Sequence, residues 1–411
     1  MSEPIRSVAI ACGGTGGHLF PGMAVAAALQ QQSCNVTLLV SAKEVDQLGV
    51  ASGPGFAIET LPAVALQNGA GFAFVRGFWK SYRLCSRLFA RQRPQAVLAM
   101  GGFISAPPIL AGRFRGATTF LHESNAIPGR ANRWLSFIVD EAFVGFSSSA
   151  RRLFTQAIRV TGTPIRSQFK PAEASACRVA LGLDPNRPVL LIMGGSQGAR
   201  RVNELVMRSL LLLGDRMPQL QFLHLTGSSD KEKVSASYQA SGRRAVVRAF
   251  LTEMELALGA ATVAIGRAGA SSLSELAAMR LPAILIPYPA AADDHQFHNA
   301  RAYVETGAAV QFAESTLDPE TLSRHVCELI ENTSARAAMS HALERWFYPH
   351  AAEEIAGRIV EMIDHPGMGA RETKPSFGSL EKAAPGPDRN SESSLAFAGE
   401  RSSARMHLEV K

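Results

Sequence analysis

The feature that most constrains the fold is a glycine-rich turn that occurs twice, each time between an apolar run and a helical pattern. The first turn, residues 13–17, follows the apolar run 6–11, and the second, residues 194–199, follows the run 189–193. Short apolar runs that end in such turns are typical of buried strands in parallel βαβ units. We therefore predict an α/β chain with two Rossmann-like domains, whose parallel sheets face each other across a cleft.

Length and further apolar runs extend this prediction to the whole chain. The 411 residues suggest about two or three domains. Additional strands are predicted at 36–40, 96–100 and 118–121 in the first half, and at 221–225, 245–247, 262–265 and 283–287 in the second.

Turn and helix signals give the domain boundaries. Gly162-Thr163-Pro164 marks a linker, so we predict an N-terminal domain over 1–163 and a C-terminal domain over 164–345. A helix within 346–364 is amphipathic and is expected to pack back on the N-terminal domain. From 365 to 411, Pro, Gly, Ser and charged residues dominate, and we predict a disordered tail.

Cysteines and apolar runs indicate the compartment. The five cysteines form no CxxC pair and no metal-ligand spacing, which is typical of reduced thiols in a reducing compartment. No apolar run approaches the roughly 20 residues that span a bilayer. The N-terminus has no secretory signal, so we expect a soluble protein.

The first turn and the histidine after it are candidates for catalysis. Backbone N–H groups of Gly13–Gly17 can approach an anion closely, and the helix that follows favours negative charge at its start. Leu19 stands where the dinucleotide fingerprint needs a small residue, which excludes that motif. The structural alternative is a turn that serves packing, with His18 as a capping residue. Because the positive end of a helix disfavours a protonated imidazole, His18 could accept a proton.

Two later turns carry hydroxyl groups at helix starts. Ser196 lies in the second turn, where a hydroxyl and backbone amides suit a pyrophosphate. Ser271 and Ser272 follow the predicted strand 262–265 and suit phosphate oxygens, and Glu275 could accept hydrogen bonds from a ribose diol. The alternative is a capping box formed by Ser272 and Glu275. Both interpretations can hold together.

Two polar clusters follow predicted strands. The string His122-Glu123-Ser124-Asn125 comes after 118–121, at the end that should face a cleft. Asp293, Asp294, His295 and His298 could suggest a metal site, but such residues are more often surface polar groups. We predict no metal.

A basic stretch indicates an anionic partner. No acidic residue stands between Leu61 and His122, and that stretch holds eight Lys or Arg residues. Spacings of three and four place several on one helical face, with aromatic residues nearby, which suits docking on anionic headgroups. The alternatives are a solvated helix face over an ordinary core, or nucleic acid, for which no binding module is recognised. The predicted docking residues are Phe72, Phe74, Arg76, Phe78, Trp79, Lys80, Arg83 and Arg87, with Arg91 on the same face and Phe89 nearby.

Taken together, these strings resemble the MurG family, peptidoglycan transferases that add N-acetylglucosamine from UDP-N-acetylglucosamine to lipid I and so form lipid II. The matching strings occur in order over about 5–364: GGTGGH (13–18) with FPG (20–22), GGF (101–103), HESN (122–125), GTPIR (162–166), GGSQGAR (194–200), the segment 267–275, and the pair Gln296 and Asn299.

The resemblance implies a GT-B fold and inverting chemistry with no cofactor and no obligatory metal. It implies His18 as the general base. The residues that it implies for UDP-N-acetylglucosamine are Thr15, Gly16, Gly17, Asn125, Arg166, Ser196, Leu251, Ala270, Ser271, Ser272, Leu273, Ser274, Glu275 and Gln296.

The resemblance also implies the partners and the place of action. The donor would be UDP-N-acetylglucosamine and the acceptor undecaprenyl-pyrophosphoryl lipid I, with anionic membrane lipids as a further partner and no nucleic acid. The enzyme would act peripherally on the cytoplasmic face of the bacterial inner membrane, in cell-wall synthesis and thus in cell shape and division. Ser124 and Phe103 depart from the HEQN and GGY strings frequent in the family, which leaves acceptor contacts open. The rival predictions are a UDP-N-acetylglucosamine 2-epimerase and an inactive scaffold protein.

Overall fold

The computed structural model describes residues 6–42, 56–62, 71–195 and 198–366. They form two sheets that belong to one compact unit, and every described strand pair is parallel. The N-terminal sheet has the order β3 (Ala57–Leu61), β2 (Asn35–Ser41), β1 (Ser7–Ala11), β4 (Ala96–Ala99), β5 (Thr118–Glu123), β6 (Glu141–Val144), β7 (Ile158–Val160). The C-terminal sheet has the order β10 (Ala245–Arg248), β9 (Gln221–Leu225), β8 (Val189–Met193), β11 (Val263–Gly266), β12 (Ala283–Leu285), β13 (Val310–Gln311).

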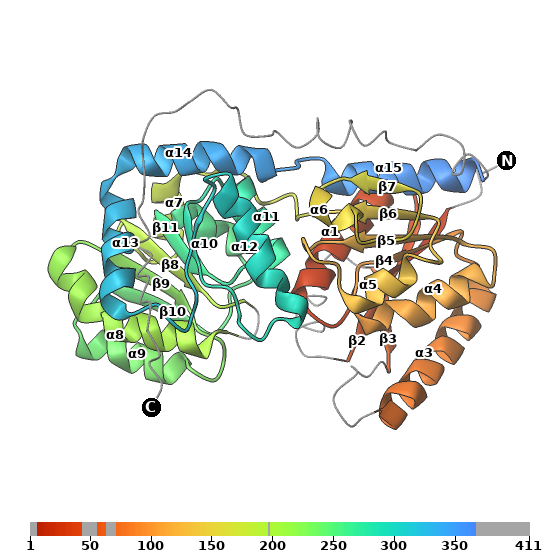
Figure 1. Ribbon diagram of the computed structural model, residues 1–411, viewed down its shortest axis with the longest axis horizontal. Helices are drawn as coiled ribbons and strands as arrows, with labels where there is room; N and C mark the ends of the chain where they lie inside the picture. Colours follow the sequence, from red (N-terminus) through yellow and green to blue (C-terminus); the bar gives the residue numbers. More distant parts are fainter. Residues whose placement is uncertain (1–5, 43–55, 63–70, 196–197, 367–411) are drawn as a thin grey trace, which may run out of the picture. The chain divides into compact units, whose positions relative to one another are not determined.

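Helices cover both sheets (Figure 1). The helices along the chain are α1 (Gly16–Gln31), α3 (Gly71–Gln92), α4 (Ala106–Arg113), α5 (Arg130–Leu135), α6 (Ser147–Ala150), α7 (Ala174–Ala180), α8 (Arg200–Arg216), α9 (Lys231–Ala240), α10 (Met254–Ala260), α11 (Ala270–Ala278), α12 (His295–Glu305), α13 (Pro319–Glu331), α14 (Thr333–Leu343) and α15 (Ala351–Asp364). Short 3₁₀ turns lie at η1 (Phe103–Ser105), η2 (Ala292–Asp294) and η3 (Glu344–Trp346).

The predicted α/β architecture with two Rossmann-like sheets is confirmed. The central strands β1 and β8 are buried almost throughout, as apolar runs between two helical layers should be. β12 ends at Leu285, two residues earlier than predicted, where the carbonyls of Ile286 and Pro287 accept hydrogen bonds from Arg267. Strands β3, β6, β7 and β13, which are short or lie at or near sheet edges, were not predicted.

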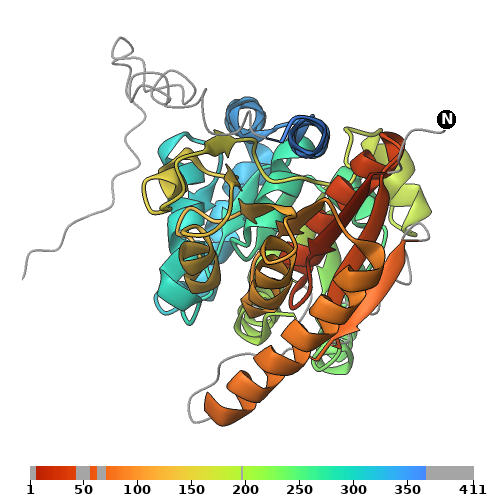
Figure 2. The ribbon, with the colours of Figure 1, turned by 90° about the vertical axis from the view of Figure 1, so that its right-hand side faces the viewer.

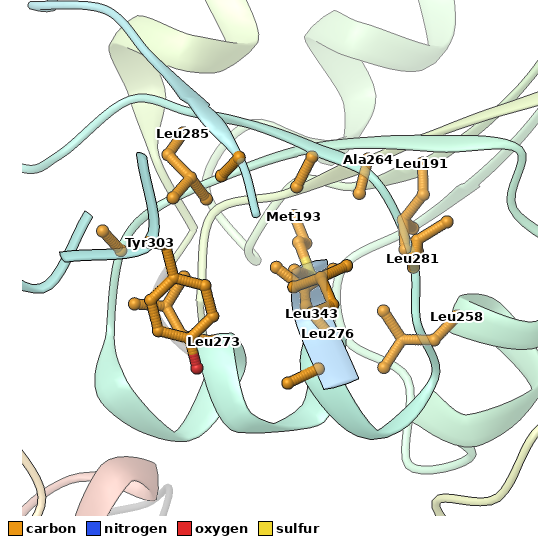
Figure 3. Packing of buried hydrophobic residues seen from close by; sticks show 14 of the residues in the cluster. Leu191, Met193, Leu258, Ala264, Leu273, Leu276, Leu281, Leu285, Tyr303 and Leu343 are labelled. Carbon is orange, nitrogen blue, oxygen red and sulfur yellow. The ribbon is translucent and has the colours of Figure 1, made fainter. Parts of the chain in front are cut away.

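Each sheet has an apolar core on both faces. Figure 3 shows one of these cores, in which Leu273 and Leu276 of α11 lie among Met193, Leu285 and Tyr303. Residues three apart in a helix lie on the same face, so Leu273 and Leu276 both face the sheet. The first turn of α11 lies at the edge of the sheet where the strands have their carboxyl ends.

The last helix returns to the N-terminal sheet. α15 lies against α1 (Figure 1), and Ile355 and Ile359 are fully buried in the core between them. The carboxylate of Glu141 on β6, 1% exposed, accepts hydrogen bonds from Arg159 at 2.6 Å and from Arg358 of α15 at 2.8 Å. The domain boundaries predicted at 163 and 345 stay predictions, and the predicted tail beyond 366 lies outside the described residues.

Candidate active site

A cavity of about 520 Å³ lies at the carboxyl ends of the strands, between the two sheets. Its walls come from the segments that follow β1, β4, β5, β8, β10, β11 and β12. Parallel strands present all their carboxyl ends at one edge, which is where ligands bind in open α/β sheets. The three glycine-rich junctions, which are the two turns 13–17 and 194–199 and the segment 266–275 that leads from β11 into α11, therefore all contribute residues to the walls of one space.

Most of the predicted donor-site residues line this cavity. They are Thr15, Gly16, Gly17, His18, Asn125, Arg166, Leu251, Ala270, Ser271, Ser272, Glu275 and Gln296.

Three predicted residues need a separate account. Ser196 lies outside the described residues. Leu273 is fully buried in the core and its N–H donates to the carbonyl of Gly269, so the prediction that it contacts the donor is corrected. Ser274 is not among the residues that line the cavity, and its hydroxyl donates to the Ala270 carbonyl at 3.1 Å, so its predicted contact with the donor stays a prediction.

The first junction holds His18 close to a glycine. Helix α1 begins at Gly16, and Nδ1 of His18 lies 3.3 Å from the hydroxyl oxygen of Thr15. A methyl group on Gly101 would lie only 2.7 Å from Nε2 of His18, and the φ of Gly101 is +118°. Both the conformation and the close approach of the imidazole require glycine at this position.

A proline in α1 links the first junction to the third. Pro21 has no N–H, so it cannot donate to the carbonyl of Gly17 four residues earlier. The hydroxyl of Ser271, at the start of α11, donates to this carbonyl at 3.1 Å. The contact joins the two halves of the chain at the cavity wall.

Asn125 is held by a buried carboxylate. Oε1 of Glu123 accepts hydrogen bonds from the backbone N–H and the side-chain Nδ2 of Asn125, at 2.8 and 3.0 Å. Oε2 accepts from the N–H of Gly129 and from Nδ2 of Asn132, at 2.9 and 3.0 Å. Burial raises the pKa of the Glu123 carboxyl, and these four donors oppose that shift. The loop after β5 is thus built around one carboxylate.

His122 connects the same strand to the linker. Its Nε2 lies 3.0 Å from the carbonyl oxygen of Gly162, which can only accept, so Nε2 carries the proton and Nδ1 accepts from Ser124 at 3.2 Å. Burial lowers the pKa of His122 to about 4, so the ring is neutral. His122 is a structural link rather than a candidate base.

Arg166 and Glu275 lie on the C-terminal side of the cavity. The Arg166 guanidinium stacks on the rings of Phe20 and Phe169, with 4.7 and 5.1 Å between the charge centre and the ring centroids. Burial raises the pKa of the Glu275 carboxyl to about 7, and the positive charge of Arg166 limits the shift. Glu275 therefore changes charge near neutral pH.

Gln296 and its neighbours complete the wall. Oε1 of Gln296 accepts from the N–H of Tyr288 at 3.0 Å, which fixes the side-chain amide. Nδ1 of His295 lies 2.8 Å from the Ala292 carbonyl, so it donates locally. Across the described ranges, no group of three or more His, Cys, Asp or Glu residues gathers that could hold a metal ion.

Helix α3 forms a second candidate surface, packed against α4 (Figure 2). All five basic residues of its predicted face are exposed, and Phe72 and Trp79 are 84% and 53% exposed. Phe89 is fully buried in the core, so its predicted place near the docking face is corrected. The ring of Phe74 packs edge-on against Phe103, a cavity-lining residue, with centroids 5.5 Å apart.

Sequence reasoning gave no role to several cavity residues. Glu123 stands in the recognised string HESN. Its position as an acidic residue at the end of a buried strand was the signal that could have indicated a role in the cavity. Asn132, which is nine residues after Glu123 in the sequence, and Phe250 had no sequence signal of their own.

The part of the chain that the structure describes has no helix long and apolar enough to cross a membrane.

Two family models match the chain. The glycosyltransferase family 28 N-terminal domain matches residues 8–144, and the glycosyltransferase family 28 C-terminal domain matches residues 189–355. Two similar relatives are each named UDP-N-acetylglucosamine–N-acetylmuramyl-(pentapeptide) pyrophosphoryl-undecaprenol N-acetylglucosamine transferase. The one from Anaeromyxobacter sp. (strain K) is 35% identical over 368 residues, 86% of this chain and 92% of the relative. The one from Chlorobaculum parvum is 35% identical over 371 residues, 86% and 99%.

Solved structures share the fold. MurG of Acinetobacter baumannii superposes with a TM-score of 0.67 at 27% identity and covers 87% of this chain and 100% of that chain. A putative UDP-N-acetylglucosamine 2-epimerase of Listeria monocytogenes has a TM-score of 0.65 at 13% identity, covering 88% and 97%. At that identity the second likeness shows the fold alone.

Proposed function

Because the chain belongs to the MurG family of glycosyltransferases, with the GT-B fold, we propose that it transfers N-acetylglucosamine from UDP-N-acetylglucosamine to the muramyl sugar of lipid I. The product is lipid II, a precursor of peptidoglycan. The observation that carries this function is that residues of all three glycine-rich junctions line one cavity.

The donor's diphosphate would lie against the helix starts at the junctions. Backbone N–H groups at the start of α11, with the hydroxyls of Ser271 and Ser272, suit the two phosphates. Their fixed dipoles would stabilise the charge that develops on UDP as it leaves. Glu275, one turn further, would accept hydrogen bonds from the ribose hydroxyls. Asn125 and Gln296 would contact the sugar.

His18 would act as the general base. The acceptor hydroxyl oxygen attacks the anomeric carbon from the face opposite UDP, the bond to the β-phosphate oxygen breaks with its electron pair, and His18 takes the hydroxyl proton. This requires Nδ1–H of His18 to donate to the Thr15 oxygen, which lies 3.3 Å away, so that Nε2 can accept. The anomeric configuration is inverted.

Helix α3 would hold the enzyme on anionic lipid at the cytoplasmic face of the inner membrane. Exposed arginines and aromatic rings on one helix suit headgroups and the upper acyl region. The contact between Phe74 and Phe103 connects this surface to the cavity wall, so a lipid-linked acceptor could reach the site. We propose no metal, cofactor or nucleic acid.

The test of the reaction is direct. The protein is incubated with UDP-N-acetylglucosamine carrying a labelled sugar and a lipid I analogue, and label in the lipid fraction is measured. We expect transfer, lost by about 100-fold or more in His18→Ala while UDP affinity stays. Release of free labelled sugar without transfer would favour an epimerase and overturn the proposal.

The test of the membrane surface uses vesicles. Co-sedimentation with vesicles rich in phosphatidylglycerol is measured for Arg83→Ser/Arg87→Ser on α3 and for the matched pair Arg208→Ser/Arg216→Ser on α8, which is exposed on the other half. We expect salt-sensitive binding that weakens by roughly 30-fold for the α3 pair only, at about 1 kcal/mol for each of the two charges removed. Equal binding of the two pairs would contradict docking through α3.

A further inference from the structure

A second cavity, of about 410 Å³, lies at the other edge of the C-terminal sheet. Thr262 and Pro282, which line it, stand directly before β11 and β12, at the amino ends of these strands. The active-site cavity lies at the carboxyl ends, so the two cavities are on opposite edges of the sheet. One face of α14 forms a further wall over residues 333–340. The residues that line this second cavity have no part in the proposed reaction.

The wall of the second cavity is positively charged. Its lining includes Arg178, Arg280 and Arg336, and none of the described residues that line it is acidic. Arg280 is paired with Glu344 at 2.8 Å. Glu173, which caps the start of α7, acts on Arg178 through space. The hydrogen bonds of Arg178 and Arg336 to other described residues all go to uncharged oxygens. Because a guanidinium stays protonated in proteins, the cavity has two positive charges held by neutral acceptors.

Arg178 and a threonine form one pair of donors. The guanidinium donates to the carbonyls of Ala260 and Pro185 at 2.9 and 2.8 Å, and to the hydroxyl of Thr262 at 3.3 Å. A guanidinium has more N–H groups than these three contacts use. The Thr262 oxygen also accepts from the N–H of Val189 at 3.1 Å, so its own hydrogen remains for another acceptor.

Arg336 and a second threonine repeat the arrangement on α14. The guanidinium donates to the carbonyls of Leu329 and Ile330 in the last turn of α13, and to the hydroxyl of Thr333 at 3.3 Å. The Thr333 oxygen is thus an acceptor, and its hydrogen remains for another partner. Both pairs line the same cavity. Guanidinium groups beside hydroxyl donors are the set of groups that binds phosphate oxygens.

We propose that this second cavity binds a small organic phosphate. The phosphate dianion would match the two charges of Arg178 and Arg336, and the organic part would contact the apolar side chains of Leu281 and Pro282. A volume of about 410 Å³ suits a small molecule rather than a lone ion. The proposal does not depend on the proposed reaction, because the site shares no residue with the active-site cavity.

The test measures the binding of phenyl phosphate and of inorganic phosphate by calorimetry. Ala337 and Ala338 are neighbouring exposed residues of α14, and only Ala337 lines the cavity. Glutamate favours a helix at both positions, so both variants should fold. The carboxylate of Ala337→Glu would repel the phosphate or pair with the arginines in its place. We expect a Kd for phenyl phosphate about tenfold higher in Ala337→Glu, and a wild-type Kd in Ala338→Glu.

The comparison of the two variants isolates this site. Phosphate bound in the active-site cavity would be the same in both, and calorimetry requires neither donor nor turnover. Equal affinities of the two variants, or no binding by the wild type at millimolar concentrations, would overturn the proposal. Phenyl phosphate should bind several-fold more tightly than inorganic phosphate, because its ring can contact the apolar wall. Equal binding of the two probes would contradict an organic ligand.

Arg280 supplies a second, independent pair of variants. Arg280 and Arg301 are both exposed and each is paired with a glutamate, at 2.8 and 2.7 Å, but only Arg280 lines the cavity. Arg280→Gln should raise the Kd for phenyl phosphate a few-fold, whereas Arg301→Gln should leave it unchanged. An equal effect of the two substitutions would contradict binding at the arginine-lined wall.

Discussion

Gly101→Ala should separate catalysis from stability. The added methyl group would lie 2.7 Å from Nε2 and 2.9 Å from Cδ2 of His18, closer than side chains pack. The imidazole lies at the far end of a flexible side chain, so it can move to another rotamer at a cost of about 1 kcal/mol. An alanine at a φ of +118° adds strain of roughly 1–3 kcal/mol. The expected loss of stability is thus about 2–4 kcal/mol.

The effect on turnover should be much larger. A general base moved out of reach forfeits its contribution, typically about 10²–10⁴ in rate. Because Gly101 follows β4 and lies apart from the helix starts that would hold the diphosphate, UDP affinity should stay within about twofold of the wild type. Transfer of labelled sugar to lipid gives kcat, and calorimetry with UDP gives affinity.

Gly307→Ala is the control for strain alone. Gly307 has a φ of +75°, and of the described residues none lies within 4 Å of the position that its methyl group would take. This variant should lose stability without losing turnover. If Gly101→Ala is folded and turns over as fast as Gly307→Ala, then the approach of His18 to Gly101 has no part in catalysis, and the reasoning is refuted.

Two further substitutions test contacts between elements. Pro21→Ala supplies an N–H that competes with the Ser271 hydroxyl for the Gly17 carbonyl. The free energy of unfolding, measured by thermal unfolding, should therefore rise by up to about 3 kcal/mol, while the KM for the donor rises a few-fold. An unchanged KM would show that the Ser271 contact has no effect on the donor. Arg358→Met leaves the buried Glu141 carboxylate with one partner, and denaturant unfolding should show a loss of about 2–4 kcal/mol at unchanged donor KM. A loss below about 0.5 kcal/mol would mean that the pair does not hold α15.

The junctions and their histidine could be predicted because the signal is local. An apolar run, a glycine turn and a helical pattern lie within about 25 residues, and parallel pairing brings the carboxyl ends of such strands to one edge. No structure was needed to expect His18 and Ser271 near each other. The sequence also contained the reason to exclude Leu273 and Phe89. Each is an apolar residue at core spacing on its helix, and a contiguous donor-binding segment cannot keep every side chain on one face.

The support behind Asn125 could not be predicted in the same way. Asn299 is 174 residues further along the chain, and its contact with Asn125 depends on how α12 and the loop after β5 meet. The role of Glu123 could not be predicted either. Burying an acid at the end of a strand is costly unless N–H groups donate to it, and here four of them do. Such convergence comes from loop geometry, for which the sequence has no periodic pattern.

Glu275 predicts opposite pH responses for the free protein and for donor binding. Burial raises the pKa of its carboxyl from 4.5 to about 7, so the folded state holds the proton more tightly than the unfolded state does. Its contribution to stability is therefore greatest at low pH and is lost as the pH rises through about 7. The ribose hydroxyls need the ionised carboxylate as an acceptor, so UDP affinity should rise over the same range. Glu275→Gln cannot ionise, so it should remove both pH dependences and weaken UDP binding at about pH 8, by roughly tenfold for a hydrogen bond to a charged group. Calorimetry with UDP at about pH 6 and pH 8, beside thermal unfolding of the free protein, measures both. A rise in UDP affinity with pH that persists unchanged in Glu275→Gln would assign the titration to UDP or to another residue and remove Glu275 from the ribose site.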